Sequence, residues 1–282
     1  MNTLSTFPEA GRRAPEPWIA RGKCLVPQPD RGNLAELASL TGAACSAMAP
    51  AEREVRLPLW HVRRDTTLLH EGMVSPTVYL VRSGTLKSVK ILEDGYEQVL
   101  SFAQPGELLG FEALHRGKQT AAVIALEDVT CFALHLAGLP ELRLTCPVLD
   151  DALQRSLSQQ LVRARESAEM MAPVSSDVRL ARFLLWTSAR MVEAGQSASR
   201  LLLRMGRRDI ASLLGVAHAT VSRSFTALTE GGYIKANNRE IEILDLQRLK
   251  LRACSTRGVF AEPCARPHPA LVSPRSEWGV SP

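Results

Sequence analysis

The chain has 282 residues, of which 45% are hydrophobic and 22% charged, a composition typical of globular proteins. That length allows two domains with cores of their own. No stretch approaches the roughly 18 apolar residues needed to cross a bilayer, and residues 1–25 lack the apolar segment of a signal peptide. These observations exclude a membrane protein, so we expect a cytoplasmic protein without a membrane partner.

The net charge of +5 is concentrated in one region of the chain. Between Arg200 and Arg252 there are eight Arg and two Lys against three Glu and two Asp, which gives the same net charge of +5. A local excess of positive charge favours nucleic acid as a partner, since each phosphate contact releases counterions. An ordinary solvated surface has the same pattern, and charge alone does not separate the two.

The first and last parts of the chain show little periodicity. Residues 1–52 are rich in Ala, Pro and Gly and contain one short helical possibility near Leu34–Leu40, so they are predicted to form a loosely ordered leader. Residues 253–282 contain five prolines and are predicted to form a disordered tail.

Short β segments separated by glycine-containing turns fill residues 53–145. The turns recur about every 8–12 residues, a spacing typical of a small sandwich or barrel. Asp94-Gly95, between two alternating runs, is the strongest hairpin signal. We therefore predict a β-barrel domain with strands at Thr67–His70, Thr77–Arg82, Thr85–Ile91, Gln98–Ala103, Ala121–Leu126 and Thr130–His135.

Residues 146–172 change to the spacing of a helix. Apolar residues recur three or four positions apart over about 24 residues, so they form one stripe. A small β domain cannot cover a stripe of that length, and pairing with a second copy of the chain would bury it. The alternative is a helix packed on its own barrel. The predicted dimerisation residues are Leu149, Leu153, Leu157, Leu161, Ala164 and Ala168.

A helix-turn-helix is predicted within residues 173–252, between Arg207 and Phe225. Ala211 is small where two helices would touch closely, and four residues later Gly215 can take the positive φ of the turn. A second helix at about Ala217–Glu230 would then enter a major groove with its first turns. A helical hairpin that does not bind DNA is the alternative interpretation.

The predicted DNA-binding residues lie on that unit and on a β-wing after it. Arg223 has the planar fork that suits guanine or a phosphate, while Thr220 and Ser222 offer short hydroxyl groups. A wing is indicated by two short strands around Asn237-Asn238. The full predicted set is Arg207 for a backbone phosphate, then His218, Ala219, Thr220, Ser222 and Arg223, and Lys235 in the wing.

A β domain, a long helix and a winged helix-turn-helix, in that order, resemble the Crp/Fnr family of regulators over residues 54–250. The stretches that carry the resemblance are Tyr79–Ser88, Asp94–Gln98, Pro105–Glu112 and Gly215–Arg223, and they are closer to the Fnr branch than to the cyclic-AMP branch. The resemblance implies an α+β fold with an N-terminal cyclic-nucleotide-binding-like barrel (a jelly roll), a long dimerisation helix and a C-terminal winged helix-turn-helix. It also implies a homodimer on palindromic double-stranded DNA, with RNA polymerase as a further partner.

The sequence departs from the family in the residues that would hold an effector. Members that bind a cyclic nucleotide hold its phosphate with an Arg-Ser or Arg-Thr pair, where this chain has Gln119-Thr120, so we expect no cyclic nucleotide. A [4Fe–4S] cluster needs four thiolates. Cys131 matches the family's β-domain ligand, but only Cys24 and Cys45 precede the barrel. These three are weak candidates for metal ligands, we expect no cluster, and the cofactor stays unidentified.

One departure concerns base reading. Fnr-like members carry a Glu where this chain has Ala219, and a carboxylate there accepts a hydrogen bond from cytosine. We therefore expect a target sequence different from that of the family.

The predicted function is that of a dimeric, sequence-specific transcriptional regulator whose β domain senses an effector and controls the recognition helices. The alternative is a ligand-binding module whose helix-turn-helix domain contacts protein instead of DNA. The sequence contains no nucleophile–base pair, phosphate-binding loop or metal-ligand spacing that would indicate an enzyme.

Overall fold

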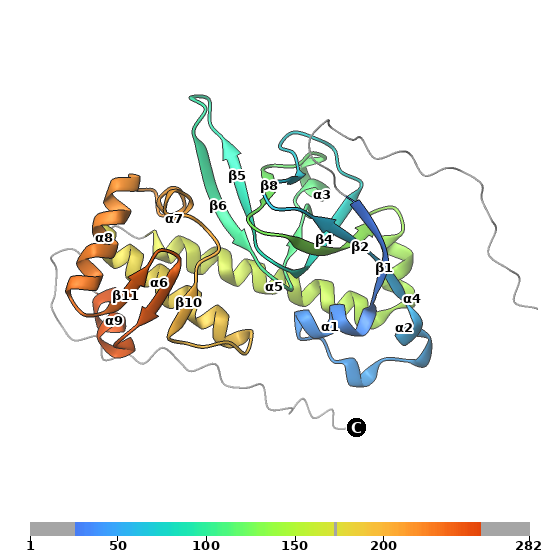
Figure 1. Ribbon diagram of the computed structural model, residues 1–282. Coiled ribbons are helices and arrows are strands. Elements are labelled where there is room, and N and C mark those ends of the chain that lie inside the picture. Colours follow the sequence, from blue (N-terminus) through green and yellow to red (C-terminus); the bar gives the residue numbers. More distant parts are fainter. Residues whose placement is uncertain (1–25, 172–173, 255–282) are drawn as a thin grey trace, which may run out of the picture. The chain divides into compact units, whose positions relative to one another are not determined.

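The computed structural model describes residues 26–171 and 174–254 (Figure 1). The chain divides into two compact units, which are described separately. The first comprises residues up to Leu86 together with Ala103–Ala152, and the second comprises Lys87–Phe102 together with the residues from Leu153 onward. Residues 1–25 of the predicted leader, with Cys24, and residues 255–282 of the predicted tail lie outside the described residues.

The β domain is built on two sheets, as the turn spacing predicts. One sheet has the strand order β1 (Val26–Asn33), β2 (Arg56–Val62), β9 (Val129–His135), β4 (Thr77–Ser83) and β7 (Leu108–Leu109). The other has the order β3 (Thr67–Leu69), β8 (Ala122–Ala125), β5 (Leu86–Ile91) and β6 (Glu97–Ala103). The short helices α3 (Ala113–Arg116) and α4 (Leu139–Thr145) follow β7 and β9.

The core of this unit is filled mainly by aliphatic side chains from both sheets. Alternation along the strands turns every second residue inward. Burial of these side chains is the main stabilising contribution, at about 25 cal/mol per Å² of apolar surface. The buried cluster comprises Val62, Leu68, Leu69, Tyr79, Val81, Leu86, Ala103, Leu109, Val123, Ala125, Val129, Cys131 and Ala133.

All six predicted strands are present, with no bound shifted by more than one residue. Three strands of these sheets, β1, β2 and β7, were not predicted. β2 carries Pro58, which cannot donate a backbone hydrogen bond and so weakens the strand signal. It nevertheless pairs with β1 at Arg31 and Pro58 and with β9 at Leu59 and Phe132. β7 has only two residues, opposite Tyr79 and Leu80, too few to show a period.

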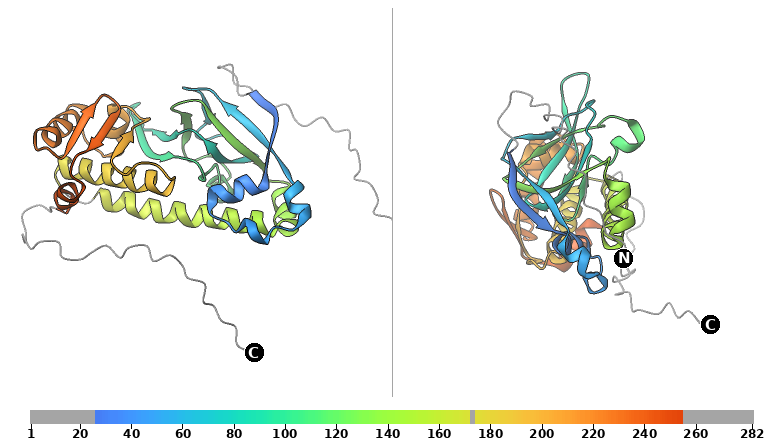
Figure 2. Two further views of the ribbon diagram at one scale, coloured as in Figure 1. Left: turned by 60° about the horizontal axis from the view of Figure 1, so that its bottom comes forward. Right: turned by 90° about the vertical axis from the view of Figure 1, so that its right-hand side faces the viewer.

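The prediction of a loosely ordered leader is wrong for residues 26–52. They form β1, helix α1 (Leu34–Thr41), a short 3-10 helix at Cys45–Ala47 and the start of α2 (Pro50–Glu54). Strands β1 and β2 run side by side in Figure 2. Asn33 caps α1, because its side chain accepts a hydrogen bond from the Glu36 amide at 2.7 Å. The helix buries Leu34, Leu37, Ala38 and Thr41 on one face. The short helical possibility near Leu34–Leu40 is therefore confirmed as α1, while the strand before it was not predicted.

The long helix α5 spans Pro147–Met170 and has the 24 residues that were expected. Its stripe divides into two parts. Leu149 and Leu153 are buried within the chain, so their assignment to a dimer interface is wrong. Leu157 is half-buried, while Leu161, Ala164 and Ala168 are exposed. The alternative of a helix packed on its own chain therefore holds for the first turns of α5. Pairing of Leu161, Ala164 and Ala168 with a second copy stays a prediction.

The second unit contains helix α6 (Ser176–Glu193), the short strand β10 (Arg200–Leu202), helices α7 (Arg207–Leu213) and α8 (His218–Glu230), strands β11 (Ile234–Asn237) and β12 (Glu240–Ile243), and helix α9 (Leu246–Ala253). The strands form a sheet in the order β10, β12, β11. Helix α6 packs against both α8 and α9. No helix within residues 26–171 and 174–254 combines the length and apolar composition of a membrane span.

Candidate nucleic-acid interface

Helices α7 and α8 form the predicted helix-turn-helix. Gly215 has a φ of +62°, the left-handed conformation that was expected of it. The Val216 amide donates to the Ala211 carbonyl at 3.1 Å and closes the turn. Ala211 is buried where the chain turns. The side chains that hold the two helices together are also buried: Ile210, Leu214, Val221 and Phe225.

Helix α8 is held in place from behind by α6. The Ser224 hydroxyl donates to the Ser176 hydroxyl at 3.0 Å, and Arg179 of α6 donates to the Leu214 carbonyl at 2.9 Å. Val221, Ser224, Phe225 and Leu228 are buried on this side of α8. The opposite side of the helix is therefore the one that can enter a groove.

Four predicted contact residues, His218, Ala219, Ser222 and Arg223, are exposed on that opposite side. Thr220 is half-buried, and the Arg223 guanidinium lies 3.4 Å from its hydroxyl oxygen. The structure thus brings together the five residues of α8 that sequence reasoning selected. We refer to them below as the reading face. Their contacts with bases stay a prediction.

Arg207 lies in a different environment from the one expected. Its guanidinium carbon is 3.1 Å from the centre of the Phe225 ring, and one nitrogen donates to the Asn238 carbonyl at 3.4 Å. Partial burial lowers the pKa of this guanidinium below its ordinary value. The side chain therefore joins α7, α8 and the wing, and a phosphate contact, which would require it to leave these partners, stays a prediction. The neighbouring Arg208, not selected from the sequence, is the exposed arginine of this turn.

The predicted wing is confirmed. Strands β11 and β12 pair between Ile234 and Ile243 and between Asn237 and Glu240. Asn238 at the turn has a φ of +54°, a conformation that Asn tolerates better than most residues. Lys235 is exposed on the wing, where an ammonium group can reach a phosphate.

Two of the three cysteines selected as weak candidates for metal ligands, Cys45 and Cys131, lie in the described residues. Cys131 lies on β9 in the core of the β domain, and burial raises the pKa of its thiol to about 12. Cys45 is half-buried, and its Sγ lies 3.5 Å from the Ala35 carbonyl oxygen. A cluster ligand must be a thiolate. The described part of the chain has no group of three or more His, Cys, Asp and Glu placed to hold a metal ion.

Gln119 occupies the position at which the resemblance places the arginine that holds a cyclic nucleotide's phosphate. Gln119 is buried, and its side-chain amide donates to the Gly110 carbonyl at 3.4 Å. The neighbouring Arg116 and Lys118 are exposed. Gln119 therefore serves the fold of the loop and offers no charge to a phosphate.

An exposed reading face on a helix-turn-helix, a wing and a separate β domain define a DNA-binding regulator of transcription. Residues 59–145 match the cyclic nucleotide-binding domain, and residues 178–252 match the Crp-like helix-turn-helix domain. The chain belongs to the Crp/Fnr family of transcriptional regulators and is not an enzyme.

Similar curated proteins are named as regulators of transcription. The transcriptional regulatory protein btr of Bordetella pertussis is 32% identical over 67% of this chain and 78% of its own length. The transcriptional activator protein Anr of Pseudomonas protegens is 32% identical over 71% of this chain and 81% of its own. Among solved structures, FixK2 from Bradyrhizobium japonicum is 25% identical with a TM-score of 0.62, covering 72% of this chain and all of the other.

Proposed function

We propose that a homodimer of this protein binds a two-fold symmetric DNA site in the cytoplasm, with α8 of each copy in the major groove, and there contacts RNA polymerase. The observation that carries the proposal is the reading face, which is open while the other side of α8 is buried. Lys235 on the wing would contact a phosphate beside each half-site.

The reading face favours a particular half-site chemistry. Arg223 has the geometry for a bidentate contact with guanine O6 and N7, and Ser222 offers a hydroxyl group to a neighbouring base edge or phosphate. Ala219 has no carboxylate to accept from cytosine, so the half-site should differ from that of relatives with Glu there.

Selection of duplexes from a random pool tests this function. The chain should enrich a site with two inverted half-sites about one helical turn apart. Binding should weaken steeply between 50 and 200 mM salt. Failure to enrich any duplex would favour the alternative, a helix-turn-helix domain that serves protein contacts.

The dimer contact is proposed to lie on the open part of α5. Leu161 is 56% exposed and Val162 is 50% exposed. Exposure of apolar side chains to water is unfavourable, and contact with a second copy would bury them. Leu161→Glu is expected to weaken dimerisation by about 100-fold or more, because it places an unpaired charge in the contact. Sedimentation measures this. The matched control is Leu144→Glu, since Leu144 on α4 is 85% exposed and should not affect the dimer.

The effector is proposed to be neither a [4Fe–4S] cluster nor a cyclic nucleotide. Cys131 is buried in the core, and the Gln119 side chain is hydrogen-bonded to the Gly110 carbonyl within its own loop. Protein purified without oxygen should show no visible absorption band and should bind the selected duplex equally in air. Iron and sulfide in amounts matching the protein would contradict this.

A further inference from the structure

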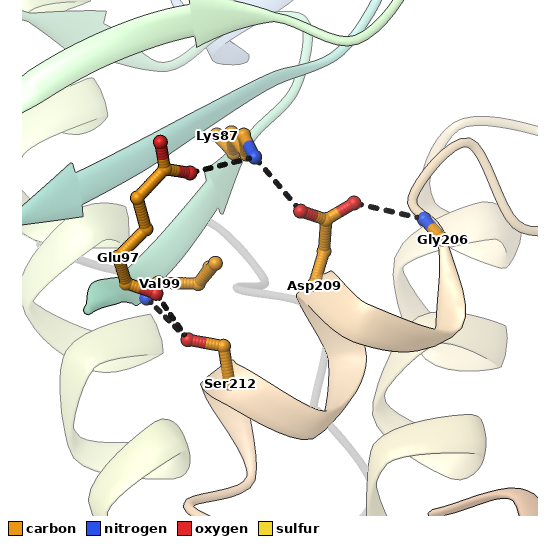
Figure 3. A network of polar contacts seen from close by, with 6 residues as sticks. All are labelled: Lys87, Glu97, Val99, Gly206, Asp209 and Ser212. Atoms are coloured by element: carbon orange, nitrogen blue, oxygen red, sulfur yellow. Dashed lines mark hydrogen bonds and ion pairs between the residues drawn. The ribbon is translucent and has the colours of Figure 1, made fainter. Parts of the chain in front are cut away.

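The β5–β6 hairpin is bonded to the first helix of the helix-turn-helix. Figure 3 shows Lys87, Glu97 and Val99 of the hairpin facing Asp209 and Ser212 of α7. All of these residues belong to the second compact unit. Nothing in the DNA-binding chemistry of α8 requires this contact.

Ser212 makes the central contact. β6 is the last strand of its sheet, so one of its edges has no neighbouring strand. The Ser212 hydroxyl donates to the Glu97 carbonyl at 2.8 Å and accepts from the Val99 amide at 2.8 Å. Gln98 adds a hydrogen bond to the Ser212 carbonyl at 2.6 Å. The buried Ser212 side chain thus satisfies backbone groups of β6 that a neighbouring strand would otherwise satisfy, and it fixes α7 to β6.

An ion pair adds to this contact at the start of α7. The Lys87 ammonium lies 2.9 Å from one Asp209 carboxylate oxygen, and the other oxygen accepts from the Gly206 amide at 3.0 Å. Both side chains are less than one-fifth exposed, so salt screens this pair less than a surface pair. The same ammonium is 3.7 Å from Glu97.

The hairpin is also fixed to α6, which supports α8. Arg190 of α6 is buried and donates to the Phe102 carbonyl, at the end of β6, at 3.3 Å. Along the chain, the hairpin continues directly into Leu86 and Ala103, which belong to the core of the β domain. The hairpin is therefore continuous in sequence with residues of that core, and hydrogen bonds and an ion pair attach it to α7.

We propose that Ser212, Asp209 and Lys87 are positioning residues, which hold the reading face at a defined orientation for DNA through the β5–β6 hairpin. They act through α7, whose orientation is passed to α8 by the short turn at Gly215 and by Arg207 against Phe225. The inference rests on the proposed DNA-binding function. A contact that only positions α8 matters when two half-sites are bound at once and matters little for one half-site, because pre-ordering lowers the cost of simultaneous engagement.

The test compares binding of the selected full site with binding of a duplex that contains one half-site. Ser212→Ala is expected to weaken full-site binding about tenfold, in line with the loss of two buried hydrogen bonds. Half-site binding should change less than about twofold, which also shows that the helix-turn-helix is folded. Lys87→Gln should act in the same direction by about threefold, as expected of a partly buried ion pair. The controls are Ser101→Ala and Lys90→Gln, exposed positions on the same hairpin.

An unchanged ratio of full-site to half-site binding in both variants would overturn the proposal while leaving the DNA-binding function intact. Equal weakening of binding to both duplexes would show that Ser212 only supports the fold of the helix-turn-helix, and this result would also overturn the proposal. A second measurement needs no DNA. Amide hydrogen exchange in α7 should quicken about tenfold in Lys87→Gln and should not change in Lys90→Gln. Equal exchange in both variants would contradict the hairpin contact itself.

Discussion

Replacing Arg223 with alanine is expected to weaken binding of the selected duplex by about 10- to 100-fold, the loss typical of one bidentate arginine–guanine contact. Preference for guanine at the position it reads should also disappear. The physical reason is that Arg223 is exposed on the reading face and has only a weak contact, at 3.4 Å, with Thr220. Within the described residues, only this weak hydrogen bond has to be broken before the guanidinium can contact a base.

Competition with duplexes that carry each base pair at each half-site position measures both effects. Lys118→Ala is the matched control, because it removes one positive charge from an exposed loop of the β domain. A uniform loss over all sequences, with the guanine preference intact, would make Arg223 a phosphate contact and would contradict base reading.

The second large effect is expected from Gly106→Ala, which should lower the free energy of unfolding of the β domain by about 3 kcal/mol. Gly106 has a φ of +86°, and a Cβ there would lie 2.4 Å from the Leu40 carbonyl oxygen. A backbone carbonyl at the end of a packed helix cannot rotate away. Urea unfolding followed by circular dichroism gives the difference.

Gly72→Ala separates packing from backbone strain. Gly72 has a similar φ, +76°, but a Cβ there would meet no atom within 4 Å. Only the strain remains, so this variant should lose about 1–2 kcal/mol. Equal losses in the two variants would show that helix α1 does not press on the turn at Gly106, and hence that the former leader segment is not part of the domain.

The helix-turn-helix was predictable because its constraints are local. Ala211 and Gly215 lie four residues apart, and both are required by a single turn. The reading face follows from them, since helical periodicity decides which residues of α8 remain exposed once Val221 and Phe225 are buried. The β strands were found for the same reason, from turns and alternation within a few residues.

The remaining features depend on partners distant in sequence. β1 is a strand because β2 lies beside it, and Pro58 gives no sign of that pairing. The stripe of α5 looks uniform, yet Leu149 and Leu153 are buried while Leu161 is exposed. The contact between Lys87 and Asp209 joins residues 122 positions apart. No spacing rule connects such residues, so the hairpin contact could only be found in the structure.

The hydrogen bonds between Ser212 and β6 also affect whether copies of the protein can pair through the open edge of β6. An open edge strand is a template on which another chain can add a strand, and the risk grows when apolar side chains are exposed beside it. Here Tyr96 is 46% exposed and Leu100 is 44% exposed on the same hairpin. Because a helix side chain occupies the Glu97 carbonyl and the Val99 amide, a second hairpin cannot pair there. We therefore expect the contact between Ser212 and β6 to reduce aggregation of the folded protein as well.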